Sequence, residues 1–242
     1  MTPATRNLLV EWAGKYESET FIPNDPVQFP HRFSRKQDIE IAGLLTAWIS
    51  FGNRKMICRK ADELLVLMQH RPLEYVMGEK WRTDFPESDG QSFYRTCPKK
   101  QMHWLFEKLY EAYRQYDSLE ETLLTFAGSP RESLCRWLDI STQSPQKKMN
   151  MFLRWMIRRN SPVDFGIWNQ FHPKDLVIPL DTHVNRIAFE LRLTDKTTYS
   201  LAQALRITEA LREIFPDDPC KGDFALFGYG VEHKNYSGST SK

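Results

Sequence analysis

Apolar residues recur at helical spacing along most of the chain. Ile39, Ala42 and Leu45 begin one such series, which predicts a helix over residues 36–51 that ends before Gly52. Comparable patterns predict further helices over residues 54–70, 100–116, 118 onwards, 130–138, 146–158, 182–192, 200–214 and 223–229. Gly, Pro, Ser and Asp are frequent in residues 80–98, where we expect a long connection. With no internal repeat and no β-hairpin pattern, the sequence predicts an all-α fold.

The composition is that of a folded protein, with 41% hydrophobic and 26% charged residues among 242. This length suits one large domain or two small lobes that share a core. The net charge of +2 is too small to indicate a polyanionic partner, so any basic surface must be local. No stretch approaches the ~20 apolar residues that span a bilayer, and charged residues interrupt residues 1–17. We therefore expect a cytoplasmic protein with no membrane partner.

The four cysteines lie far apart along the chain and form no C-x-x-C pair. This spacing argues against a zinc ribbon and against a four-cysteine iron–sulfur cluster. It also provides no disulfide framework, which fits a reducing compartment. We expect no metal, no iron–sulfur cluster and no other cofactor. The cysteines are Cys58, Cys97, Cys135 and Cys220.

Residues 145–160 contain five cations and no acid. On a helical wheel Lys147, Arg154 and Arg158 share one face, opposite an apolar face that includes Phe152. Such a face could follow a phosphate backbone, bind an acidic protein or simply be solvated. Because solvated faces usually mix charges through i,i+4 pairs, the pattern favours a nucleic acid.

Two further features of the sequence could carry chemistry. Lys147 lies at the N-terminal end of its helix, where the helix dipole and neighbouring cations favour the neutral, nucleophilic amine. Asp181 follows an apolar extended run and precedes a helix, which is an N-cap position. A carboxylate oriented there could stabilise a developing positive charge or relay protons. The alternatives are a lysine that points into water and an aspartate that only caps a helix.

Four segments resemble the helix-hairpin-helix DNA glycosylase/lyase superfamily. Leu180–Arg186 resembles its aspartate motif, and Lys147–Asn150 resembles the start of its lysine-bearing helix. Ala42–Arg54 is similar to its early helix and following turn, and Asp218–Gly230 to its last helix. Within the superfamily the chain most resembles an uncharacterised bacterial family that shares the lysine-helix and P-L-D-T-H motifs. The resemblance covers residues from about 36 to 230.

The resemblance implies a two-lobed helical fold with a cleft between the lobes. Residues 36–140 would form a barrel-like lobe and residues 1–35 with 141–230 a second lobe, while residues 237–242 would be a disordered tail. It implies a monomeric base-excision repair glycosylase with β-lyase activity on a damaged base in double-stranded DNA, and an oxidised purine is one candidate. Lys147 would attack C1′ of the sugar, and Asp181 would stabilise the cationic sugar.

The resemblance also suggests the residues that bind DNA. Asn53 and Arg54 would fill the space that the extruded nucleotide leaves in the base stack. Lys148, Arg154 and Arg158 would contact the backbone. Thr182 and His183, which follow Asp181, complete the candidate DNA contacts, and the candidates for a base pocket are Trp155, Phe224 and Phe227.

The chain departs from the superfamily at the hairpin. In place of L-P-G-V-G before the lysine it has Ser141–Pro145, which lacks the glycines that expose amides to a phosphate. The interval between Lys147 and Asp181 is also longer than in most members. The archaeal 8-oxoguanine glycosylases share both features, and the missing cysteine cluster separates the chain from the endonuclease branch. A non-catalytic nucleic-acid-binding protein and a helical interaction module remain the alternatives.

Overall fold

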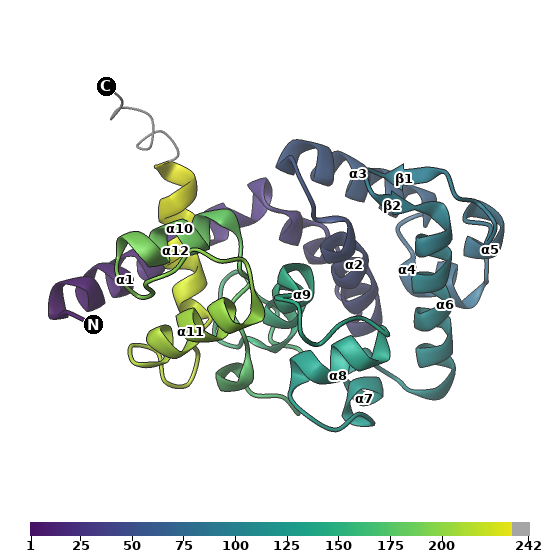
Figure 1. Cartoon of the computed structure of the whole chain (residues 1–242). Coiled ribbons are helices and arrows are strands. Elements are labelled where there is room, and N and C mark those ends of the chain that lie inside the picture. Colours follow the sequence, from purple (N-terminus) through teal and green to yellow (C-terminus); the bar gives the residue numbers. More distant parts are fainter. Residues whose placement is uncertain (234–242) are drawn as a thin grey trace. The chain divides into compact units, whose positions relative to one another are not determined.

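The computed structural model describes residues 1–233 and is predominantly helical, with 61% helix and 2% strand. The prediction of an all-α fold is therefore confirmed at the level of secondary structure (Figure 1). The expected tail at residues 237–242 lies outside the described residues. In the part of the chain that the structure describes, no helix combines the length and apolarity needed to cross a membrane.

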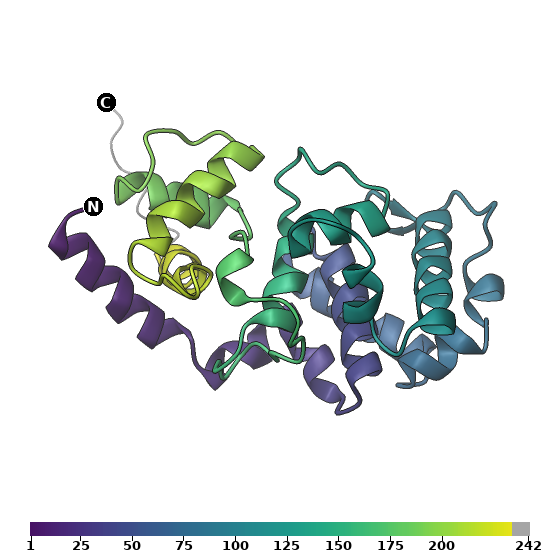
Figure 2. The same cartoon turned by 90° about the horizontal axis from the view of Figure 1, so that it is seen from below.

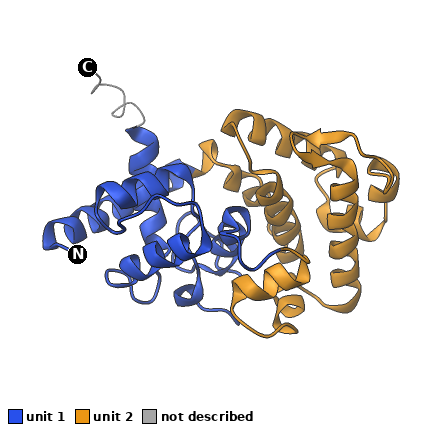
Figure 3. Ribbon diagram, in the orientation of Figure 1, with its two compact units in different colours: residues 1–21, 141–242 blue, residues 22–140 orange. Residues whose placement is uncertain are grey.

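The chain divides into two compact units (Figure 3). Unit 1 comprises Met1–Phe21 and Ser141–Lys242, and unit 2 comprises Ile22–Ile140. The expected lobes were divided after residues 35 and 140, and the compact units are divided after residues 21 and 140. Residues 22–35 belong to unit 2 because the short helices they contain pack on α2 (Lys36–Ile49) and α3 (Arg54–Leu67) of that unit.

Unit 2 is built around α2 (Lys36–Ile49), which is buried along almost its whole length. Its sequence is apolar on every side, as expected for a helix surrounded by others. The buried acid Glu40 accepts hydrogen bonds from Tyr113 Oη at 2.8 Å and Leu119 N at 3.0 Å. The remaining helices of unit 2 are η2 (Pro26–Gln28), η3 (Pro30–Arg32), α3 (Arg54–Leu67), α4 (Pro72–Met77), α5 (Trp81–Asp84), α6 (Lys99–Gln115), α7 (Leu119–Leu124) and α8 (Pro130–Trp137), and η1 (Glu19–Asn24) crosses the boundary between the units.

Local capping determines several helix starts. Ser118 Oγ accepts from Glu121 N at the start of α7, as its sequence predicts. A complete capping box is present one helix later, where Ser129 and Glu132 bond reciprocally at the start of α8. These short-range signals explain why both starts are readable in the sequence.

The expected long connection over residues 80–98 is partly ordered into regular structure. It contains α5 and a two-stranded antiparallel hairpin, β1 (Ser92–Tyr94) with β2 (Cys97–Pro98), so the absence of a hairpin was predicted wrongly. Ser92 Oγ donates to Arg95 O at 2.8 Å across a turn in which Arg95 has a φ of 50°. The strands are too short to produce a recognisable alternation of apolar and polar residues.

Unit 1 joins the first helix of the chain to its C-terminal part. Helix α1 (Pro3–Tyr16) packs across α12 (Lys221–Glu232) (Figures 1 and 2), and Trp12 stacks on Tyr229 with 3.8 Å between ring centroids. Gly228 permits this approach, because a Cβ there would overlap the Tyr16 ring. The other helices of unit 1 are α9 (Lys147–Ile157), η4 (Pro173–Asp175), α10 (Thr182–Glu190) and α11 (Leu201–Arg212).

A continuous apolar core supports α10, which begins directly after Asp181, and the extended segment before it. Leu180, Val184 and Ile187 pack with Ile207 of α11 and Leu226 of α12. Both α10 and the extended segment before it are therefore anchored by buried side chains. The position of Asp181 follows from that packing.

Candidate functional site

Lys147 is the first residue of α9 and follows a turn formed by residues 141–146. Gln146 precedes it with a φ of 45° and provides no side-chain cap. Instead, Gln146 Nε2 donates to Ser141 O at 2.8 Å and closes the turn on itself. The Lys147 side chain is 30% exposed, so its amine is accessible to a ligand.

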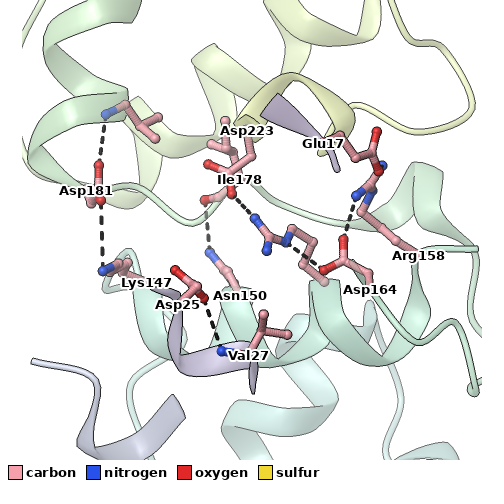
Figure 4. A network of polar contacts seen from close by, with 12 residues as sticks. Glu17, Asp25, Val27, Lys147, Asn150, Arg158, Asp164, Ile178, Asp181 and Asp223 are labelled. Carbon is pink, nitrogen blue, oxygen red and sulfur yellow. Dashed lines mark hydrogen bonds and ion pairs between the residues drawn. The ribbon is translucent and has the colours of Figure 1, made fainter. Parts of the chain in front are cut away.

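Asp181 caps α10 and at the same time lies beside Lys147. Its Oδ1 accepts from Val184 N at 2.8 Å, and its Oδ2 lies 4.0 Å from Lys147 Nζ (Figure 4). The Asp181 side chain is 13% exposed. The cap orients the carboxylate, while a separation of 4.0 Å is too long for a direct hydrogen bond to the amine. The two groups are adjacent, and the amine is not held by the carboxylate.

Asn150 connects the two elements that carry these groups. Its Nδ2 donates to Pro145 O at 3.0 Å and to Ile178 O at 3.4 Å, and its side chain is buried (Figure 4). Thr208 Oγ1 accepts from Ile178 N at 3.1 Å and holds the same segment from α11. Sequence reasoning quoted Asn150 within the lysine motif but assigned it no role. Its position three residues after Lys147 was the available signal.

The two arginines expected to contact DNA are buried in ion pairs, so that prediction was wrong. Arg154 Nε lies 3.3 Å from Asp164 Oδ1, and Arg154 Nη1 bonds Asp223 Oδ2. Arg158 is 1% exposed and bonds Asp164 at 2.5 Å (Figure 4). It also bonds Asp218 and Glu17, each at 2.8 Å. We call these two arginines and four carboxylates the buried charge cluster.

The buried charge cluster escaped prediction because all its acids lie outside the helix that carries the two arginines. No acid lies on α9 itself. Glu17 directly follows α1, Asp164 and Asp218 lie on loops, and Asp223 lies on α12. Arginine is well suited to such a site, because its planar guanidinium pairs bidentately with carboxylates. Arg158 Nε contacts both oxygens of Asp218, at 2.9 and 3.0 Å.

Burial and charge shift the protonation of this cluster. Burial raises the pKa of Asp223 to about 6, although Arg154 acts in the opposite direction and the charge of Asp181 adds to the rise. Burial would lower the pKa of Arg158, but Asp164, Asp218 and Glu17 raise it well above its usual value. The cluster therefore holds permanent cations and at least one carboxyl group that is protonated more readily than usual.

The chain matches the model of a family described as a protein of unknown function (DUF2400) over two segments, residues 25–138 and 131–232. The chain belongs to this family. In the corresponding searches no curated protein and no solved structure matched it. The second matched segment contains Lys147, Asn150 and Asp181, so the site lies within the span that defines the DUF2400 family.

The three aromatic residues expected to form a base pocket differ in burial in this DUF2400 member. Trp155 and Phe224 are buried, and the guanidinium carbons of Arg154 and Arg158 lie 4.4 and 5.2 Å from the Phe224 ring centroid. Neither ring is accessible to a base, so these two assignments were wrong: both belong to the interior of unit 1. Phe227 is partly buried and lies edge-on to His183, with 6.1 Å between ring centroids.

The remaining candidates lie at the surface. Lys148 and His183 are half-buried and Thr182 is exposed. Asn53 caps α3, with Oδ1 accepting from Met56 N at 3.3 Å, and Arg54 Nη1 reaches Asn24 O at 3.5 Å. Asn53 and Arg54 belong to unit 2, whereas Lys147 and Asp181 belong to unit 1.

Sequence reasoning missed an exposed aromatic residue beside Asn53. Phe51 is 56% exposed at the turn between α2 and α3, and the Arg95 guanidinium lies 5.3 Å from its ring centroid. Tyr94 Oη donates to Phe51 O at 3.1 Å. Gly52 allows the turn because its φ is 101°. An apolar residue directly before Gly-Asn-Arg was the signal that could have identified it.

The described residues contain no group of three or more His, Cys, Asp or Glu side chains placed to hold a metal ion. What the site offers is an accessible primary amine and an oriented carboxylate, 4.0 Å apart. An amine in this position can act as a nucleophile, and the carboxylate can accept a proton or stabilise a cation.

Proposed function

We propose that this protein is a DNA glycosylase with an associated β-lyase activity, acting on a damaged base in double-stranded DNA. The observation that carries the proposal is the approach of Lys147 Nζ to Asp181 Oδ2, at 4.0 Å, on two elements that resemble the lysine and aspartate motifs of the glycosylase/lyase superfamily. The two units would be the lobes of a glycosylase-like fold. Membership of the DUF2400 family is compatible with the proposal and does not test it.

In the proposed reaction the neutral amine of Lys147 forms a bond to C1′ of the damaged nucleotide. The bond from C1′ to the base breaks, and the base leaves with that electron pair and gains a proton. The substituted amine loses a proton, and opening of the sugar ring converts the C1′–N bond into an imine. Loss of a C2′ proton and departure of the 3′ phosphate then cleave the strand.

Asp181 has two roles in this reaction. Its negative charge stabilises the positive charge that develops on the sugar as the base departs. Its Oδ2 also accepts the proton that the substituted amine gives up, because it is the oxygen nearest to Lys147 Nζ. The bond from Val184 N to Oδ1 keeps the carboxylate in place throughout.

The DNA contacts of the proposal are fewer than the sequence suggested, because Arg154 and Arg158 are internal. Lys148 and Thr182 flank the two reactive groups along the chain, and they would contact the backbone. The turn that carries Phe51, Asn53 and Arg54 would enter the base stack, with the exposed ring of Phe51 as the stacking surface.

Borohydride trapping tests the proposal directly. Duplexes that contain an abasic site or 8-oxoguanine should yield a covalent protein–DNA adduct, because borohydride reduces the imine to a stable amine. Lys147→Ala should abolish the adduct, whereas Lys148→Ala should weaken DNA binding and still be trapped at saturating protein. This comparison separates the nucleophile from a neighbouring cation.

Failure of the trapping experiment has a defined meaning. Salt-sensitive binding to duplex DNA without any adduct across a panel of lesions would indicate a non-catalytic nucleic-acid-binding protein. An adduct that survives Lys147→Ala would show that another amine acts as the nucleophile. Either result overturns the assignment of Lys147.

A further inference from the structure

A hollow of about 500 Å³ opens in unit 1 at the C-terminal end of α9. Three segments line it: residues 158–160, the start of η4 and the turn that leads into α12. Helix α9 has 11 residues, so this hollow and Lys147 are at opposite ends of a helix about 16 Å long. The volume is in the range of pockets that hold small ligands. The hollow is therefore a separate candidate site.

The lining of the hollow includes three cations that form no ion pair within residues 1–233. Among the described residues, no acid lies within ion-pair distance of Arg159, Lys174 or Lys221, although all three line the hollow. The lining has two carboxylates, and that of Asp218 is already bonded to Arg158. Asp217 is the one lining carboxylate that forms no ion pair among the described residues.

The walls of the hollow are held in place by internal contacts. Arg159 Nη2 donates to the carbonyl oxygens of Asn169 at 2.9 Å and Phe171 at 3.1 Å, which fixes the loop before η4. Arg158, on the other wall, belongs to the buried charge cluster. A cavity whose walls are already ordered binds a ligand without a large entropic cost for its own ordering.

The chemistry of the lining selects an anion with more than one negative charge. Lysine ammonium groups are compact charges that commonly bind phosphate, and His172 and Asn160 add further hydrogen-bond donors at the rim. We propose that this hollow binds a phosphate group through Lys174 and Lys221, with Arg159 contributing its charge from the wall. The phosphate could belong to a mononucleotide or to the backbone of DNA, and experiment distinguishes the two sources.

The test is to titrate the full chain with pyrophosphate, with adenosine 5′-monophosphate and with a short undamaged DNA duplex by isothermal calorimetry. The Lys174→Ala, Lys221→Ala double variant should bind at least one probe about tenfold more weakly, because each lysine supplies a charge-assisted contact. Lys196→Ala removes an exposed lysine of the same unit that does not line the hollow, and should leave binding of all probes unchanged.

A variant that binds the probes more tightly controls for unfolding, because an unfolded variant would not gain affinity. Asp217→Asn removes the one uncompensated carboxylate of the lining and should tighten binding severalfold. Loss of pyrophosphate and mononucleotide binding in the double variant, with duplex affinity unchanged, identifies a small phosphate ligand. A parallel loss of duplex affinity, with a smaller salt dependence, identifies a backbone phosphate.

Two results overturn the proposal: no saturable binding of any probe to the unmodified chain, or equal affinities in the unmodified chain and the double variant. Neither result bears on Lys147, because borohydride trapping is scored separately. A trapped adduct with no effect of Lys174 and Lys221 would leave the proposed reaction in place and remove this site.

Discussion

The two ends of α9 carry cations on the same face and surround them differently. At the N-terminal end Lys147 is 30% exposed and has one carboxylate 4.0 Å away. About three turns further on, Arg158 is 1% exposed and bonds three carboxylates at 2.8 Å or less. The amphipathic pattern identifies the polar face of a helix, but only tertiary structure determines whether a cation on that face is solvated, reactive or structural.

The two ends of α9 should differ most in how much their cations contribute to the free energy of unfolding. Arg158→Ala leaves Asp164, Asp218 and Glu17 without their shared partner, and should lower the free energy of unfolding by about 3–5 kcal/mol. Lys147→Ala should change it by less than about 0.5 kcal/mol. Urea unfolding followed by circular dichroism measures both. Equal losses in the two variants would show that the ends of α9 are electrostatically alike.

The pH dependence of stability tests the buried charge cluster at the Arg158 end of α9. The pKa of Asp223 is raised to about 6, so the folded protein binds that proton more tightly than the unfolded chain does. Stability from this group is complete below about pH 4, is lost as the pH rises through about 6 and is constant above that, with a total of at most about 3 kcal/mol.

The Asp223→Asn variant is the matched control for this pH dependence. Asparagine keeps the shape and an acceptor for Arg154 but does not titrate. The difference in unfolding free energy between the original chain and the variant should therefore change between pH 4 and 6.5 and be flat above pH 7. Because exposed carboxylates titrate in both proteins, only this difference is informative. A difference independent of pH would contradict the raised pKa of Asp223.

The fold was readable from the sequence where short-range signals determine it. The structure begins α9 at Lys147 and α10 at Thr182, each within one residue of the predicted start. Apolar periodicity and caps are properties of a few neighbouring residues, so one sequence is enough to recognise them. The β1–β2 hairpin was missed because its strands have three and two residues, too few to form a pattern.

The candidate site was readable only in part, for a related reason. The motifs pointed to Lys147 and Asp181, and the structure brings their side chains together. The carboxylates that pair with Arg154 and Arg158 are 6 to 141 positions away along the chain, beyond the reach of any helical pattern. The same holds for Asn150, whose contact with Ile178 O joins segments 28 positions apart.

Substitution of Asn150 tests the Lys147 end of α9 and should have an effect on stability of intermediate size. Asn150→Ala removes the donor to the buried Ile178 O and the partly buried Pro145 O, and should cost about 1–3 kcal/mol of stability. If the proposed reaction is correct, trapping at saturating DNA should slow by about tenfold, because the amine and the carboxylate lose their fixed separation.

A second buried asparagine serves as the control for Asn150. The Asn185 side chain holds the loop before α11: its Nδ2 donates to Thr197 O at 2.8 Å, and its Oδ1 accepts from Gln203 Nε2 at 2.9 Å. Asn185→Ala should therefore cost similar stability without slowing the trapping reaction. Equal slowing in both variants would indicate that reduced stability, and not positioning by Asn150, limits the reaction.

The smallest expected change in stability separates the two roles of Asp181. Asp181→Ala removes the acceptor for Val184 N and should cost about 1 kcal/mol, whereas Asp181→Asn keeps an oxygen there and should cost only a few tenths. If the carboxylate charge also serves the proposed reaction, both variants should trap abasic DNA much more slowly and by similar factors. Thermal unfolding and single-turnover trapping measure the two effects separately. A variant Asp181→Asn that traps at the original rate would leave Asp181 as a helix cap alone, and the reactivity of Lys147 would then have to arise without a neighbouring negative charge.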